Sequence, residues 1–162
     1  MIKTVAYTLA LAMFVTSPGA NAGETSAPAF TLPGMDGKQH QLGEWHNKVV
    51  LLNFWASWCS PCQSEIRDLV AYQSKYGADG LQIVGVGLDD AQKLRNVQRS
   101  LEINYPILLD NSPGNPVMRS FGNHEGVVPF SVLISREGEV LYTHTGLIDG
   151  EIFSEEVVSR LK

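Results

Sequence analysis

The chain contains only two cysteines, Cys59 and Cys62, and they lie two residues apart. The stretch before them, Val49–Trp55, is almost continuously apolar, as expected for a strand buried on both faces. Pro61 suits the first turn of a helix, where the missing N–H of proline leaves no hydrogen bond unmade. The sequence therefore predicts a strand, a tight turn and a helix, with Cys59 at or just before the helix N-terminus.

This location would change the chemistry of the Cys59 thiol. The helix dipole and the unpaired N–H groups of the first turn favour an anion, so they lower a thiol pKa from about 8.5 towards neutrality or below. The resulting thiolate attacks disulfides, and a second thiol within reach, here Cys62, resolves the mixed disulfide. The pair therefore predicts redox catalysis.

The cysteine pair has two other interpretations, an inert structural disulfide and half of a zinc site. An inert structural disulfide would close a very small loop, which offers little of the stabilisation that a long loop provides. A four-cysteine zinc site would need a second pair, which the chain lacks, so only histidine or carboxylate groups could complete it. Both interpretations explain the pattern less well than redox catalysis does.

The rest of the sequence predicts an α/β domain in which strands alternate with helices around a central, mixed sheet. An N-terminal β-hairpin comes first and a central βα insertion interrupts the order. The expected strands are 30–32, 38–42, 48–56, 81–88, 105–109, 130–135 and 140–145. The expected helices run from the cysteines to 76, from 89 to about 103, through 117–121, and from 150 to 161.

Residues 1–22 have the pattern of a cleavable signal peptide. Lys3 supplies the positive charge, residues 4–15 are apolar, and residues 20–22 offer small side chains for cleavage. The apolar run is shorter than the roughly 20 residues that span a membrane, although an uncleaved anchor is the alternative. Residues 23–162 would then form one domain in an oxidising compartment. The whole chain has a net charge of -5, and this acidic character argues against nucleic acid as a partner.

The longest motif is VVLLNFWASWCSPC at residues 49–62, with Glu65 three residues further on. Further matching stretches are VGVGLD at 84–89, YPILLD at 105–110 and VPFSVLI at 128–134. Together they resemble the thioredoxin superfamily, and specifically its exported TlpA/ResA-like thiol–disulfide oxidoreductases. The resemblance extends over nearly the whole chain after the signal and implies a thioredoxin-like fold.

The resemblance also implies roles for individual residues. Cys59 would be the exposed attacking thiol and Cys62 the buried resolving one. Pro129 would be a cis-proline facing the cysteines, Val128 would offer backbone groups to an extended substrate, and Trp58 would cover the rim of the site. No cofactor is implied beyond the redox-active Cys59–Cys62 disulfide.

Three positions depart from the family pattern. Asn53 stands where thioredoxin has a buried aspartate. Glu65 is therefore the nearest carboxylate for proton transfer. The simpler interpretation of Glu65 is a surface acid in the first helical turn. Arg67 replaces a proline, which predicts a less kinked helix. Ser60 and Pro61 place no cation between the thiols, and this favours a reductant over an oxidant.

These features predict a periplasmic, monomeric disulfide reductase of exported proteins, with a role in cytochrome c maturation as one possibility. The family resemblance implies that a membrane electron conduit of the DsbD type would regenerate the dithiol. Peroxide reduction is disfavoured, because a peroxidatic thiol does not normally lie in a WCxxC turn. The alternative function is copper or zinc handling by Cys59, Cys62 and His124, with Glu125 beside the histidine.

Overall fold

The computed structural model describes residues 26–161, so the predicted signal peptide lies outside the described residues. The strands are β1 (Thr31–Pro33), β2 (Gln39–Gln41), β3 (Val49–Trp55), β4 (Leu81–Gly87), β5 (Ile107–Leu109), β6 (Phe130–Ile134) and β7 (Val140–Thr145). The α-helices are α1 (Ser60–Tyr76), α2 (Ala91–Ser100), α3 (Pro116–Ser120) and α4 (Gly150–Ile152). Short 3₁₀ turns η1 (Leu42–Trp45) and η2 (Gly77–Asp79) precede β3 and β4.

Five strands form one mixed sheet in the order β5-β4-β3-β6-β7. β3 pairs in parallel with β4, and β4 with β5, whereas β6 is antiparallel to both β3 and β7. The hairpin β1-β2 forms a separate two-stranded sheet. This arrangement confirms the predicted thioredoxin-like α/β fold with its N-terminal hairpin. Because β3 is the central strand, the turn that follows it lies at the middle of one end of the sheet, where β3 stops.

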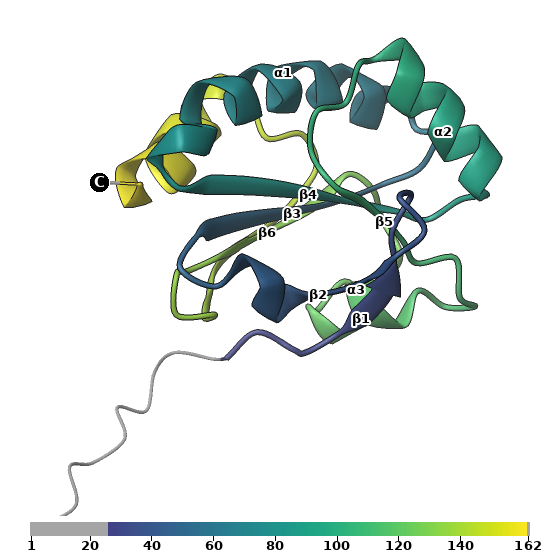
Figure 1. The fold of residues 1–162 in the computed structure, drawn as a ribbon, viewed down its shortest axis with the longest axis horizontal. Coiled ribbons are helices and arrows are strands. Elements are labelled where there is room, and N and C mark those ends of the chain that lie inside the picture. The colour runs from purple at the N-terminus through teal and green to yellow at the C-terminus, as the bar shows by residue number, and fades with distance from the viewer. Residues whose placement is uncertain (1–25, 162) are drawn as a thin grey trace, which may run out of the picture.

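The sheet separates two apolar layers. In Figure 1, α1, α2 and the C-terminal helices cover one face, whereas the hairpin and α3 lie on the other. β3 is buried along its whole length, and its side chains alternate between the layers, with Leu51 and Trp55 in the first and Leu52 and Phe54 in the second. The continuous apolar run in the sequence follows from burial on both faces.

Two predicted elements, α2 and β5, are shorter than expected by two or more residues. α2 ends at Ser100 rather than near Ile103, because Glu102 adopts a left-handed conformation with φ of 51°. β5 begins at Ile107 rather than Tyr105, and the intervening Pro106 has no N–H to contribute to the ladder.

The C-terminal helix also differs from the regular helix predicted for 150–161. After α4 it widens into a π-helical turn, η3 (Phe153–Val157), and tightens into a 3₁₀ turn, η4 (Val158–Arg160). Phe153 and Val157 are both buried against the first layer of the core. A regular helical period therefore does not describe this segment.

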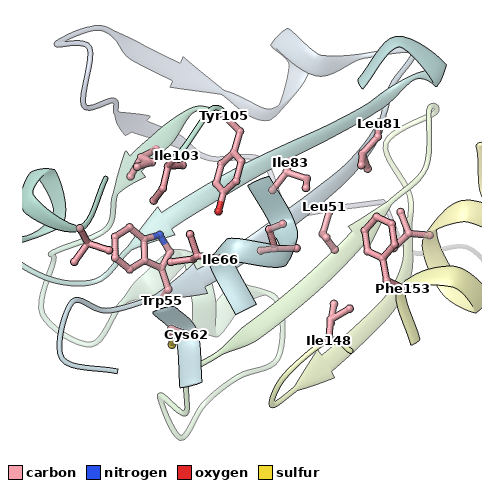
Figure 2. Close-up of a cluster of buried hydrophobic side chains, with 14 of the residues drawn as sticks. Leu51, Trp55, Cys62, Ile66, Leu81, Ile83, Ile103, Tyr105, Ile148 and Phe153 are labelled. Carbon is pink, nitrogen blue, oxygen red and sulfur yellow. The ribbon is translucent and has the colours of Figure 1, made fainter. Parts of the chain in front are cut away.

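Phe153 fastens the C-terminal helix to α1. The Phe153 ring stacks on the Tyr72 ring with centroids 3.7 Å apart, and Phe153 is 2% exposed. Figure 2 shows Phe153 in the same buried cluster as Cys62. We expect Phe153→Ala to lower the free energy of unfolding by about 3–5 kcal/mol, because it removes a large ring and leaves a cavity. Urea denaturation measures this loss; Ser154→Ala, an exposed position in the same turn, should change stability by less than about 0.5 kcal/mol.

The N-terminal hairpin is closed by His40, whose ring lies between two carboxylates. Nδ1 is 2.8 Å from Glu44 Oε2, and Nε2 is 3.1 Å from Asp36 Oδ1. These hydrogen bonds, led by the one to Glu44, raise the pKa of His40 above its ordinary value of 6.5. The hydrogen bonds of Asp36, to the Lys38 N–H and to His40, and that of Glu44 to His40 lower the pKa of both carboxyl groups.

The interaction of His40 with Asp36 and Glu44 should stabilise the protein most between about pH 4.5 and 6.5, where the histidine is charged and both carboxylates are ionised. Its contribution is lost as the pH rises through the folded pKa of His40, and also as the pH falls through those of the carboxylates. We therefore expect His40→Gln to lower the free energy of unfolding more at pH 5.5 than at pH 9. Urea titrations of both proteins at the two pH values measure this; an equal loss at both would contradict an interaction between charged groups.

Candidate active site

The cysteine pair lies at the junction of β3 and α1, as predicted. β3 ends at Trp55, the Cys59 N–H donates to the Ala56 carbonyl oxygen at 3.1 Å, and Cys59 is the N-cap residue of α1. Cys59 and Cys62 form a disulfide with their Cα atoms 5.3 Å apart. The Cys62 N–H points at Cys59 Sγ over 3.2 Å. A thiolate at Cys59 would receive this same N–H and the positive end of the helix dipole.

Neither cysteine is well exposed in the disulfide form. Cys62 is fully buried, as predicted, but Cys59 is only 4% exposed, so the expectation of an openly exposed attacking thiol is wrong for this state. The loop before β6 approaches Cys59, with the Val128 carbonyl oxygen 3.8 Å from its sulfur. The order of accessibility still agrees with the prediction, since only the Cys59 side of the bridge reaches the surface.

The peptide bond between Val128 and Pro129 is cis, which confirms the expectation drawn from the family resemblance. The Pro129 carbonyl oxygen accepts a hydrogen bond of 2.8 Å from the Gly146 N–H, which holds this loop beside the end of β7. Val128 is half-buried there, and its carbonyl oxygen faces Cys59 Sγ.

Trp58 is 71% exposed, so it is a rim residue rather than a packed core aromatic. It lines a groove of about 300 Å³ together with Val128, Leu88 and Met118, and His124 and Glu125 also contribute to its wall. The groove thus joins the turn before Cys59 to the cis-proline loop. An extended segment could lie here with apolar side chains against Trp58.

Two hydrogen bonds hold the turn before Cys59, and neither of them was predicted from the sequence. The Ser57 hydroxyl donates to Asp89 Oδ2, and the Gln63 side-chain amide donates to the Ser57 carbonyl oxygen at 2.7 Å. The hydrogen bond from Ser57 is the main cause of a lowered pKa for Asp89. The Asp89 carboxylate is thus ionised and holds the turn that carries Trp58.

Glu65 is buried beneath the cysteines, so its interpretation as a surface acid is wrong. It is 2% exposed; Oε2 accepts from the Asn53 side chain at 2.8 Å, and Oε1 accepts from the Ile148 N–H at 2.7 Å. Burial raises the pKa of Glu65 above its ordinary value of 4.5, although both hydrogen bonds oppose the shift. The helix stripe Cys62, Glu65, Ile66 and Leu69 explains the burial, because these positions share one face.

Asn53 brings the Glu65 carboxylate to the centre of the sheet. The Asn53 amide also donates to the Ser131 hydroxyl at 3.0 Å. Asn53 on β3 and Ser131 on β6 are direct partners in the sheet. Glu65 therefore takes part in a buried polar network beside the resolving cysteine, three residues from it on the same helix face. Ser131 was missed, although a serine inside the apolar run 130–134 was a usable signal.

Arg67 stands where the family usually has proline, and it therefore predicts a less kinked helix. It lies in an unbroken α1 of 17 residues, and its guanidinium donates to the Gln63 carbonyl oxygen at 3.1 Å. The helix therefore runs through the position where the family usually has proline.

The proposed metal set is not assembled. Within residues 26–161, no three His, Cys, Asp or Glu side chains are placed to hold a metal ion. His124 lines the Trp58 groove, and the two cysteines are joined in the disulfide. The metal-handling alternative thus gains no support from the geometry. In the same range, no helix is both long and apolar enough to cross a membrane.

A thioredoxin-like sheet, a CxxC disulfide at a helix N-terminus and a facing cis-proline together define a thiol–disulfide oxidoreductase. Comparison with known proteins agrees. Residues 24–143 match the model of the AhpC/TSA family, and the chain belongs to that family. This protein is an enzyme, a thiol–disulfide oxidoreductase of the thioredoxin fold similar to ResA, and enzymes of this kind act without a cofactor.

Individual relatives are similar over most of their length. The thiol-disulfide oxidoreductase ResA of Geobacillus thermodenitrificans is 29% identical, over 98% of this chain and 89% of that protein. ResA of Bacillus subtilis is 29% identical, over 90% of this chain and 79% of that protein. A crystal structure of a thiol:disulfide interchange protein from Chlorobium tepidum has a TM-score of 0.75 and 29% identity, over 88% of this chain and 100% of that chain.

Proposed function

We propose that this protein is an exported disulfide reductase that acts on other exported proteins. Residues 1–22 would direct export to the periplasm and be removed, and the domain from 23 to 162 would act as a monomer. The observation that carries the proposal is the position of Cys59 as the N-cap residue of α1, with Val128 of the cis-proline loop 3.8 Å away. One sulfur is thereby placed both to ionise and to meet a docked segment.

The reaction begins with the reduced protein. The Cys59 thiolate attacks one sulfur of a substrate disulfide, the substrate S–S bond breaks, and the departing sulfur takes up a proton. Cys59 is then joined to the substrate in a mixed disulfide. The helix N-terminus stabilises the thiolate before attack, and backbone docking along Val128 and Pro129 aligns the substrate.

Cys62 completes the cycle. It loses its proton to Glu65 and attacks Cys59 Sγ, which breaks the mixed disulfide and releases the second substrate thiol. The Cys59–Cys62 bridge forms and two electrons have passed to the substrate. A carboxyl group whose pKa is raised towards the working pH suits this proton transfer, because acceptor and donor become better matched.

The reduced state must be restored by an external two-electron donor, and we propose a membrane reductant of the DsbD type. Substrates would be exported proteins with accessible disulfides. Apocytochrome c belongs to this class, since its CxxCH thiols must be reduced before haem attaches; a particular exported enzyme is the other candidate.

The reduction potential tests the direction of electron flow. With no cation between the two thiols at Ser60 and Pro61, we expect a value near or below that of thioredoxin, about −270 mV. Equilibration with defined thiol–disulfide buffers, followed by thiol counting, measures it. A potential near that of DsbA, about −120 mV, would make the protein an oxidant and overturn the proposal.

A further inference from the structure

The loop before the cis-proline is organised by one buried amide. Asn123 is 8% exposed, and its Oδ1 accepts from the Gly126 N–H at 3.0 Å and from the Val127 N–H at 3.3 Å. Its Nδ2 donates to the Val127 carbonyl oxygen at 2.7 Å. The side chain therefore occupies both backbone groups of Val127, as a paired strand would.

Of the three residues Val127, Val128 and Pro129, only Val128 keeps backbone groups that can pair. Pro129 has no N–H, and its carbonyl oxygen is bonded to Gly146. Val127 is satisfied by Asn123 on both sides. In residues 26–161, no partner occupies the Val128 N–H, and its carbonyl oxygen faces Cys59 Sγ. Of these three residues, Val128 alone is open to an incoming chain.

We propose that Asn123 is a positioning residue that sets the register of the docked substrate. The inference rests on the proposed function, because it assumes a protein disulfide lying along Val128. If the Val127 groups were free, a segment could pair one residue earlier, where its side chains would face the opposite way and its disulfide would move from Cys59. By closing Val127, the amide of Asn123 excludes that register.

The position of Asn123 fits this role better than a purely architectural one. Val127 is 45% exposed, so its backbone groups could be satisfied by water without any side chain. An internal partner at an exposed residue removes a competing docking site rather than an unsatisfied buried group. Within residues 26–161, neither Asn123 nor Val127 bonds to a reacting sulfur, so the effect should appear with a docked protein substrate and not in the intrinsic exchange rate.

The test compares a large and a small disulfide. Fully reduced wild type and Asn123→Ala are mixed with increasing insulin, quenched by alkylation at intervals, and the oxidised fraction is counted by mass. We expect the maximal rate at saturating insulin to fall about tenfold in the variant, because most of the bound insulin then lies in the register that cannot react. The rate with 5,5′-dithiobis(2-nitrobenzoate), which needs no backbone docking, should stay within about twofold.

Two further variants sharpen the comparison. Asn123→Asp retains the acceptor for Gly126 and Val127 but loses the donor to the Val127 carbonyl, so its insulin effect should be intermediate. Asn104→Ala removes an amide that bonds Val70 and Ser74 away from the site, and it should alter neither reaction. Should Asn123→Ala fail to fold, Asn123→Asp carries the test alone.

An unchanged maximal rate with insulin in Asn123→Ala or, if that variant does not fold, in Asn123→Asp would overturn the inference. An equal loss with insulin and the small disulfide would also overturn it, since that pattern marks general damage. A wild type that reacts with the small disulfide but not with insulin would instead remove the proposed function, and the inference with it. The two failures are therefore distinguishable.

Discussion

Replacing Cys59 by alanine should abolish disulfide reduction, with a loss of at least about a thousandfold in turnover. Cys59 is the cysteine at the helix N-terminus and the only one of the pair with any exposed surface, so no other group can make the first attack. Insulin reduction by dithiothreitol, followed as turbidity, measures the catalysed rate. Because the variant cannot form the Cys59–Cys62 bridge, its stability should be compared with that of reduced wild type.

Cys62→Ala is the matched control for this variant. It removes the same bridge but leaves the attacking sulfur, so it should capture one substrate molecule as a mixed disulfide and then stop. Undiminished turnover by Cys59→Ala would contradict the assignment of the nucleophile. A mixed disulfide that accumulates in Cys59→Ala and not in Cys62→Ala would reverse the two roles.

Glu65→Gln should slow resolution of the mixed disulfide by about a hundredfold at pH 7, the lower range for loss of a proton-transfer group. Glutamine keeps the size of the side chain, but its single oxygen can accept from only one of Asn53 and Ile148, and it cannot take the Cys62 proton. The loss should shrink as the pH rises, because hydroxide can then remove that proton. Single-turnover release of substrate from the mixed disulfide, followed between pH 6 and pH 9, measures both effects.

The same substitution should change how stability depends on pH. Because burial raises the pKa of Glu65 above 4.5, the folded protein binds this proton more tightly than the unfolded chain does. The contribution of Glu65 to stability therefore declines as the pH rises from about 4.5 through the folded pKa. Glu65→Gln should remove this decline from urea titrations.

Glu137→Gln is the control for both measurements, because it makes the same chemical change at an exposed acid in the turn between β6 and β7. It should leave the rate within about twofold. A release rate for Glu65→Gln equal to that of wild type across the whole pH range would show that Cys62 loses its proton by another route.

Local patterns were sufficient to predict the elements that carry the cysteines. The apolar run 49–55 and the proline at position 61 are short-range signals, and β3 and the start of α1 follow them closely. The order of strands and helices restricted the fold to a layered α/β domain. The cis peptide at Pro129 required the family resemblance, since composition alone favours a trans bond.

The remaining site features depend on contacts between distant parts of the chain. Glu65 is buried because Asn53 lies 12 residues before it and Ile148 lies 83 residues after it, and no local pattern contains those partners. The near burial of Cys59 comes from the loop at Val128, 69 residues away. The role of Asn123 needed the positions of three backbone groups in one loop, which spacing does not specify.

The ionisation of the Cys59 thiol provides the most direct test of the mechanism. The reduced protein would be alkylated with iodoacetamide at a series of pH values, and the labelled cysteine identified by mass. We expect Cys59 to react before Cys62, with a rate that reaches half of its maximum clearly below pH 8.5, the ordinary thiol value. A midpoint at or above 8.5, or first labelling of Cys62, would contradict a thiolate stabilised at the N-terminus of α1.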